Sequence, residues 1–207
     1  MQKVNIFFLL NSDTILLNNA IKIFYDWMEK YNKHNQIGAI GSILLNENLE
    51  ENLSYGFFPK TSDLFVKEFS FINKIFKKNK IKKVNNVGKL NDSFEVDYIT
   101  GADLFIPKTV IQDIGLFDEK FFMYYEETDL QFRMKQRNYL RKIIKGPKII
   151  HLESKSTNIK ISKLKLLEKS KIIYFEKNEK NKIKLFLLKK VYILIRISKT
   201  LFQKNFY

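Results

Sequence analysis

The residues with the clearest chemical potential are five carboxylates that fall within twelve residues near the middle of the chain. They are Asp118, Glu119, Glu126, Glu127 and Asp129, and the residues between them are rich in Phe and Tyr. A charge in apolar surroundings is costly to desolvate, so acids beside large aromatic residues indicate a place that meets a cation or a proton donor. The alternative is a loop whose aromatic residues lie in the core while its acids are solvated. The pattern alone leaves both interpretations open.

Composition limits the classes of protein and site that fit this chain. The 207 residues correspond to one domain or a little more, and a 45% share of hydrophobic residues with 19 Phe is enough for a sizeable core. The absence of Cys excludes a disulfide framework, a thiolate zinc site and a cysteine nucleophile. The apolar run at residues 6–10 is too short for a signal peptide, and we expect no membrane-spanning segment.

The net charge of +15 is concentrated at the C-terminal end of the chain. Residues 154–207 hold 15 of the 37 Lys and Arg residues but only 3 of the 22 acids, a net charge of +12, which leaves +3 for residues 1–153. Within this tail Lys182, Lys189, Arg196 and Gln203 recur every seven residues and share one helix face. Such a tail can lie on an anionic membrane surface, or pack on the body with its lysines solvated.

Nucleic-acid binding is the competing interpretation of this basicity. It is disfavoured because the sequence has no recognisable nucleic-acid motif and because the body is nearly neutral. Filter binding over a salt series tests it, since phosphate contacts give a steep dependence on salt.

The elements that must position these residues follow from hydrophobic periodicity and from turn signals. Between about 46 and 92 the pattern is irregular, which indicates a variable excursion. Strands are predicted at 4–10, 37–45, 94–100, 140–144 and 148–150. Helices are predicted at 14–31 with Ser12 or Asp13 as the cap, near 69–78, from Pro107 to the residue before Gly115, at 126–137 and from 164 onward. Strand, helix and strand in succession favour an α/β sheet with parallel neighbours.

Ligands in such sheets bind at the carboxyl ends of strands, which draws attention to four places. They are Asn11–Asp13, Gly101–Asp103, His151 and the acidic helix start at Glu126–Asp129. Taken in this order they resemble the motifs of the family 2 glycosyltransferases of the GT-A fold, and most closely the bacterial rhamnosyltransferase-like branch that builds cell-surface polysaccharides. The resemblance covers most of residues 4–157.

Three motifs carry the resemblance. Asn11-Ser12-Asp13-Thr14 follows a strand as the family's Asn-x-Asp does, and Gly101-Ala102 follows a later strand. Residues 115–133 match Gly-x-Phe-Asp-Glu-x-Phe-Phe-x-Tyr-x-Glu-Asp-x-Asp-Leu-x-x-Arg at every fixed position except one, where Glu127 replaces the usual Asp. His151, followed by Ser154 and Ser156, closes the pattern.

The resemblance implies an α/β fold of the Rossmann-like GT-A type, a mostly parallel sheet flanked by helices, over residues 1–157, with a basic amphipathic helical tail over 158–207. The family's domain begins well before its Asn-x-Asp strand, whereas Met1 lies ten residues before Asn11. The chain thus resembles the later part of that domain without the nucleotide-binding start. A sheet that lacks its first strands exposes an apolar edge, so we expect weak stability alone and pairing with a separate N-terminal fragment.

The resemblance also implies roles for single residues. Asp13 and His151 would hold Mg²⁺ or Mn²⁺, although Asp13 taken alone reads as a helix cap and His151 as a histidine at a strand end. Glu127 or Glu126 would be the catalytic base, since neighbouring like charges raise one pKa and suit it to proton transfer. Donor or acceptor contacts are expected from Asn11, Gly101, Ala102, Asp103, Asp129 and Tyr125.

The aromatic residues of the central motif have two interpretations. Phe117, Phe121 and Phe122 are expected to pack in the core beneath a turn formed by Asp118 and Glu119. Tyr124 and Tyr125 are placed either to stack on a sugar ring or to pack.

The function implied is that of an inverting, metal-assisted glycosyltransferase of the hexosyltransferase type. It would move a sugar from a nucleotide-diphospho-sugar to a glycan or lipid-linked acceptor, in the cytoplasm or at the inner face of the membrane, for cell-envelope polysaccharide synthesis. One alternative is a non-catalytic remnant or complementing subunit of a split glycosyltransferase. Another is a basic membrane-binding or nucleic-acid-binding module.

Overall fold

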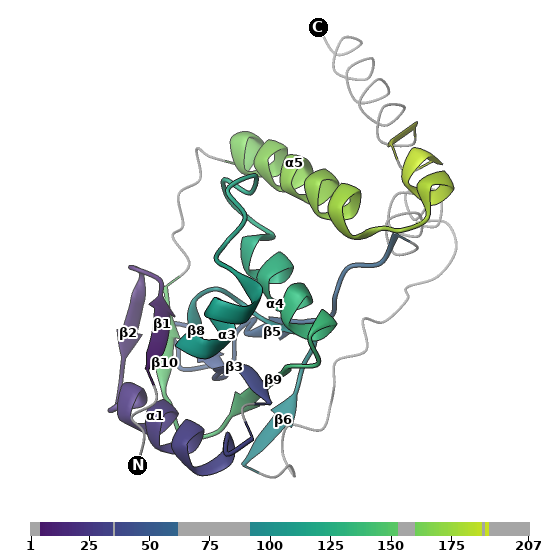
Figure 1. The fold of residues 1–207 in the computed structure, drawn as a ribbon. Coiled ribbons are helices and arrows are strands. Elements are labelled where there is room, and N and C mark those ends of the chain that lie inside the picture. Colours follow the sequence, from purple (N-terminus) through teal and green to yellow (C-terminus); the bar gives the residue numbers. More distant parts are fainter. Residues whose placement is uncertain (1–4, 35, 62–91, 153–159, 188, 191–207) are drawn as a thin grey trace, which may run out of the picture.

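The computed structural model describes residues 5–34, 36–61, 92–152, 160–187 and 189–190 (Figure 1). The helix predicted near 69–78 lies outside these described residues, as do residues 191–207 of the tail. The other predicted elements can be compared with the structure directly.

A five-stranded mixed sheet forms the centre of the fold, in the order β1-β8-β3-β9-β6 (Figure 1). These strands are β1 (Ile6–Leu10), β8 (Asp103–Pro107), β3 (Ile37–Gly41), β9 (Leu140–Ile144) and β6 (Ser93–Glu95). Only the β3–β9 pair is parallel, since β8 is antiparallel to both β1 and β3 and β6 is antiparallel to β9. The expectation of a mostly parallel sheet is therefore wrong. β1 and β3 do run in the same direction, but the later strand β8 lies between them.

Two smaller sheets extend the centre. β2 (Thr14–Leu16) and β4 (Leu44–Leu45) flank β10 (Ile149–His151), antiparallel and parallel to it respectively. β5 (Tyr55–Gly56) pairs with β7 (Tyr98–Ile99). The predicted strands at 37–45 and 94–100 are thus each divided in two. The break after Gly41 is where Ser42 turns its backbone N–H and hydroxyl to the Asp103 carboxylate.

Helices cover both faces of the central sheet. On one face α1 (Ala20–Tyr31) buries Phe24 and Met28, and the Phe24 ring lies 5.4 Å from that of Phe105 on β8. On the other face α3 (Lys108–Ile114) and α4 (Glu126–Gln136) pack their buried residues against Leu104 and Ile106 of the same strand. Successive residues of β8 therefore face opposite layers, as the two-residue period of a strand requires. The predicted helices at 107–114 and 126–137 are confirmed.

The helix predicted at 14–31 begins later than expected. Thr14–Leu16 form β2, because this segment pairs with β10, and α1 starts at Ala20. Its cap is Asn19, whose Oδ1 accepts a hydrogen bond from the Lys22 backbone N–H at 3.2 Å. The interpretation of Asp13 as a helix cap is therefore wrong, and its carboxylate is free for another role.

The predicted C-terminal helix is present as α5 (Lys160–Asn178). Its last turns pack on the body, where the buried Tyr174 and Phe175 meet Phe121. After a short break, residues 182–187 and 189–190 are helical again. Within the described ranges, no helix is long and apolar enough to cross a membrane.

Candidate functional site

Strand pairing brings the side chain of His151 to those of Asn11 and Asp13, about 140 residues earlier in the sequence. In the β2–β10 register Thr14 faces His151, and the Leu152 N–H donates to the Asp13 carbonyl at 2.9 Å. As a result His151 Nε2 lies 3.3 Å from Asp13 Oδ1 and 3.4 Å from Asn11 Nδ2. Asn11, Asp13 and His151 were all predicted as site residues, and the structure places the three side chains together at one strand end.

The Asp13–His151 pair has donor atoms that suit a divalent cation. Two donors that lie about 2.1 Å from one octahedral ion, at right angles to each other, are about 3.0 Å apart. The observed 3.3 Å is close to this separation, and carboxylate oxygen with imidazole nitrogen is a set that Mn²⁺ accepts. Residues 5–61 and 92–152, with the described part of the tail, hold no cluster of three or more His, Asp or Glu side chains. The remaining ligands would thus come from other groups, such as substrate phosphates and water.

The second part of the site is the start of α4. Tyr124 and Tyr125 have φ values of 68° and 69°, the left-handed conformation that residues with a side chain seldom adopt. Each such residue costs about 1–2 kcal/mol, and the cost is tolerated where the surroundings hold the backbone in place. This double left-handed turn ends the loop and directs the next two residues, Glu126 and Glu127, into the first turn of α4.

These glutamates line a cavity of about 560 Å³, which lies between the end of β1 and the loop before α4. Asn11, whose amide contacts His151, lines the same cavity, so the Asp13–His151 pair lies next to it. The complete lining is Leu9, Leu10, Asn11, Gly101, Phe117, Met123, Tyr124, Glu126 and Glu127. Four predicted site residues therefore share one cavity: Asn11, Gly101, Glu126 and Glu127.

The two glutamates differ in their electrostatic surroundings. Burial, followed by repulsion from the neighbouring Glu126 carboxylate, raises the pKa of Glu127 to about 7. Burial also raises the pKa of Glu126, whose Oε2 is buried and makes no hydrogen bond. A general base works best when its pKa lies near the working pH. Glu127 meets this condition.

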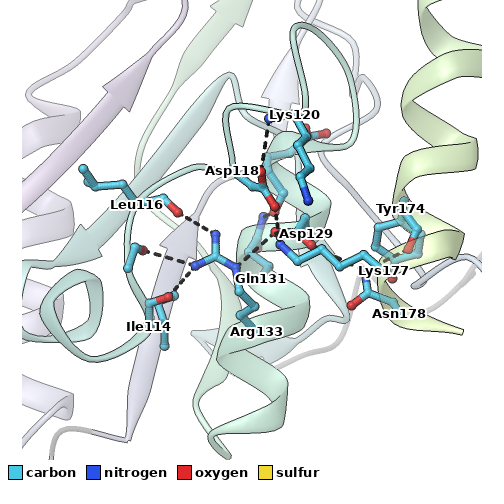
Figure 2. A network of polar contacts seen from close by, with 12 residues as sticks. Ile114, Leu116, Asp118, Lys120, Asp129, Gln131, Arg133, Tyr174, Lys177 and Asn178 are labelled. Atoms are coloured by element: carbon cyan, nitrogen blue, oxygen red, sulfur yellow. Dashed lines mark hydrogen bonds and ion pairs between the residues drawn. The ribbon is translucent and has the colours of Figure 1, made fainter. Parts of the chain in front are cut away.

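A polar network fixes the loop that carries the cavity wall (Figure 2). Asp129, with a fully buried side chain, accepts hydrogen bonds from Arg133 Nε at 3.1 Å and from Lys177 Nζ at 2.8 Å. Arg133 in turn donates to the carbonyls of Ile114 and Leu116, and Lys177 also binds Asp118 at 2.8 Å. The hydrogen bond and charge of Lys177 lower the pKa of Asp118. Figure 2 shows Lys177 extending from α5 to both carboxylates, so this helix helps to hold the loop before α4.

The other predicted contact residues lie outside the cavity lining. Ala102 is buried in the core, and Tyr125 packs with its ring 5.4 Å from that of Tyr174. Asp129 serves the network just described. The Asp103 side chain is buried on β8, where Oδ2 accepts hydrogen bonds from the Ser42 backbone N–H at 2.7 Å and from its hydroxyl at 2.6 Å. None of Ala102, Asp103, Asp129 and Tyr125 is among the residues that line the cavity.

Asp103 makes stability depend on pH. Burial raises its pKa to about 7 in the folded protein, above the usual 3.8, so the native state binds more protons than the unfolded state between about pH 4 and pH 7. The contribution of Asp103 to the free energy of unfolding is at its maximum below pH 4 and is lost as the pH rises to 7. We expect Asp103→Asn, which mimics the neutral acid, to remove this loss, on the order of 4 kcal/mol.

Urea denaturation of both proteins at four or five pH values tests the Asp103 prediction. The free energies of unfolding should diverge towards pH 8, with the variant more stable. Glu127 remains in both proteins, so the difference between the two curves reports Asp103. Parallel curves would contradict the prediction.

The aromatic residues of the loop do not all pack as predicted. Phe121 is buried against Tyr174 and Phe175, as expected. Phe122 is 80% exposed and Phe117 lines the cavity, so the expectation of core packing is wrong for these two. Residues 115–125 form a loop of bends and turns, so no regular period holds the three rings on one side.

The sequence analysis missed several residues of the site. Leu9 and Leu10 were assigned to a buried strand, yet β1 ends at the cavity and both residues line it. Lys177 lay within the basic tail, where nothing in the pattern distinguished it from the other lysines. Its partners are 48 and 59 residues away, and only the docking of α5 identifies them.

Among known proteins, matches to this chain were found with solved structures alone. No family model matches it, and no curated protein matches it. Among the solved structures that match is the crystal structure of GalNAc-T7 with UDP, GalNAc and Mn²⁺, which is 10% identical and gives a TM-score of 0.47. This match covers 90% of the present chain but 38% of that chain, so the present chain spans a minor part of that protein's length. The likeness is distant and concerns the fold alone, and none of these comparisons supports the rhamnosyltransferase-like branch.

Proposed function

We propose that this protein is a glycosyltransferase that transfers a sugar from a nucleotide-diphospho-sugar to a hydroxyl acceptor with inversion of configuration. The observation that carries the proposal is the half-buried carboxylate pair Glu126–Glu127 in a cavity of about 560 Å³, beside a second polar pair, Asp13–His151. The first pair suits proton removal from a hydroxyl, and the second suits a cation that accompanies a diphosphate.

The reaction would be a single displacement at the anomeric carbon. Glu127 takes the proton of the acceptor hydroxyl as its oxygen forms a bond to that carbon. The bond between the carbon and the diphosphate oxygen breaks, and the nucleoside diphosphate leaves with the electron pair. Because the pKa of Glu127 is about 7, about half of the molecules hold the basic form at neutral pH.

Charge develops on the diphosphate as it leaves. Asp13 and His151 would hold Mg²⁺ or Mn²⁺, which when bound neutralises that charge. Asn11 contacts His151 of the Asp13–His151 pair and also lines the cavity, where its amide can orient the donor or the acceptor. Leu9, Leu10 and Met123 give the cavity an apolar part of its wall beside the two glutamates.

The decisive experiment is calorimetric titration of the full chain with Mn²⁺ plus UDP, and separately with Mn²⁺ plus dTDP. We expect binding that requires the metal and that weakens at least 100-fold in Asp13→Ala and in His151→Ala, because each change removes a ligand. Asp26→Ala is the matched control, since it removes an exposed carboxylate whose partner is Lys22 on α1. Equal binding by Asp13→Ala and wild type would reject the cation site.

A second candidate function, a complementing subunit of a split glycosyltransferase, is favoured by the edge of the central sheet. Within the described part of the chain β1 pairs only with β8, and Phe7 and Leu10 on this edge strand are 42% and 39% exposed. An exposed apolar edge strand is a template for another strand. In the same titration a folded chain that binds no nucleotide, but binds once a separate N-terminal fragment is added, would favour this function.

For either function we propose a glycan or lipid-linked acceptor of the cell envelope. This assignment rests on the sequence motifs and not on the cavity. Assays of donor hydrolysis and transfer over a panel of nucleotide-diphospho-sugars would identify the sugar.

A further inference from the structure

The helical residues 182–187 and 189–190 form a segment with two distinct sides (Figure 1, yellow-green end). Leu185 faces the body and packs against the cluster of Phe121, Tyr174 and Phe175. Ile183, Phe186 and Leu187 recur at i, i+3 and i+4, so they lie on one helix face. That face points away from Leu185 at 100° per residue. The body therefore covers one side of the segment and leaves the apolar face outside.

The orientation of the segment is fixed by several contacts. The Asn181 side chain accepts hydrogen bonds from the backbone N–H groups of Ile183 at 3.0 Å and of Lys184 at 3.1 Å, which caps the helix start. Lys189 forms an ion pair with Glu176 on α5 at 2.6 Å. Glu179, just before the segment, accepts a hydrogen bond from the Thr61 hydroxyl at 2.7 Å. Turning the apolar face inward would break these contacts.

The outward face combines apolar and cationic side chains. Ile183 is 72% exposed, Phe186 57% and Leu187 48%, values at which large apolar residues seldom cluster on a surface without a partner. Residues 180–190 contain five lysines and no carboxylate. Lys190 Nζ lies 4.8 Å from the centre of the Phe186 ring, so charge and apolar surface adjoin directly. We call Ile183, Phe186, Leu187, Lys180, Lys182 and Lys190 the tail patch.

We propose that the tail patch binds an anionic phospholipid surface, with Ile183, Phe186 and Leu187 entering the interface and the lysines contacting the headgroups. An amphipathic helix with exposed apolar side chains and flanking lysines fits such a surface, because apolar burial and attraction to anionic lipid then act together. Long lysine side chains can extend from the buried edge to the headgroups. The proposal is independent of the transferase chemistry.

Two other occupants fit the tail patch less well. A second copy of the chain would place five lysines against five lysines in a two-fold contact, without a carboxylate from this segment to pair with them. A nucleic acid would engage the lysines, but its phosphates offer no burial for Ile183, Phe186 and Leu187. A bilayer with anionic headgroups offers burial to the apolar residues of the tail patch and negative charge to its lysines.

Flotation of the full chain with vesicles tests the proposal. Vesicles of phosphatidylglycerol and phosphatidylcholine at 3:7 are compared with pure phosphatidylcholine, at roughly 0.05 M and 0.5 M salt, since salt screens surface charges. We expect the protein to float with the anionic vesicles at low salt, and at least tenfold less with neutral vesicles or at high salt. Flotation that is equal on both vesicles, or absent from both, would overturn the proposal.

Two variants test the lysines and the apolar residues of the tail patch separately. Lys180→Gln, Lys182→Gln and Lys190→Gln combined should lower partitioning more than tenfold, because each lysine contributes about fivefold. The matched control changes three exposed lysines elsewhere to Gln, Lys33, Lys108 and Lys148, and should partition as wild type despite the same change in net charge. Ile183→Ser, Phe186→Ser and Leu187→Ser combined should also abolish flotation while Leu185 keeps the segment on the body.

Three further results bear on the tail patch. If the two triple lysine variants lose partitioning equally, overall charge and not the patch is responsible. If the triple Ser variant floats as wild type, the apolar face has no role. Concentration-dependent dimers that disappear in the triple Ser variant would assign the face to a second copy. Each of these results overturns the proposal.

Discussion

Glu127→Gln should abolish sugar transfer while the protein keeps its fold and its nucleotide affinity. The change keeps the shape of the side chain but removes the group that accepts the hydroxyl proton, and loss of a general base lowers rates by about 10²–10⁴-fold. The desolvation that raises the pKa of Glu127 also favours a neutral side chain at this position, so we expect no loss of stability. Steady-state transfer rates, with calorimetry of nucleotide binding, measure the two effects separately.

The pH profile gives an independent test of the same assignment. The basic form of Glu127 is lost below its pKa of about 7, so the rate should be level above pH 7 and fall about tenfold per unit below it. Glu127→Asp, which restores the usual family residue but shortens the side chain, should retain a lower rate and a shifted profile. Glu119→Gln is the matched control, since Glu119 is an exposed acid of the same loop outside the cavity lining.

Glu126 should behave differently from Glu127. Its charge contributes to the raised pKa of Glu127, so Glu126→Gln should lower that pKa and move the fall in rate to lower pH. A larger loss of rate in Glu126→Gln than in Glu127→Gln would exchange the two roles.

The second large effect is expected from Asp129→Ala, which should destabilise the fold by about 3–5 kcal/mol. The Asp129 side chain is fully buried and binds Arg133 and Lys177, which are only 18% and 32% exposed. Removal of the carboxylate leaves the Arg133 side chain, which is mostly buried, without this partner, whereas Lys177 keeps its contact with Asp118. The loop before α4 should loosen as well, because Arg133 holds the carbonyls of Ile114 and Leu116.

Chemical denaturation measures this loss, and two variants provide its scale. Asp118→Asn breaks a more exposed contact of the same lysine and should lower the free energy of unfolding by about 1 kcal/mol or less. Asp26→Ala removes an exposed i, i+4 pair and should have a similarly small effect. If Asp129→Ala is no more destabilising than these two, the buried network does not hold the loop.

The sequence alone determined most of the local structure and much of the site. Pro107 and Gly115 predicted the bounds of α3, acids in the first turn fitted the start of α4, and short apolar runs predicted β1, β9 and β10, because these signals are local in the sequence. The motif at residues 115–133 singled out Glu126 and Glu127, and both line the cavity. The strand-end rule placed Asn11 and His151 at sheet edges, and the structure finds them 3.4 Å apart.

Only the tertiary structure decided the order of the strands and the chemistry of the carboxylates. The position of β8 between β1 and β3 depends on packing between distant segments, since β8 is antiparallel to both and no local pattern encodes its neighbours. The pKa of Glu127 depends on burial, and the ion pair of Asp129 with Lys177 depends on the docking of α5, 48 residues away. Local propensities reflect the backbone preference of each residue and the spacing of apolar residues along its own segment. Desolvation and charge pairing depend instead on what the rest of the chain brings alongside, and this is absent from any one stretch of sequence.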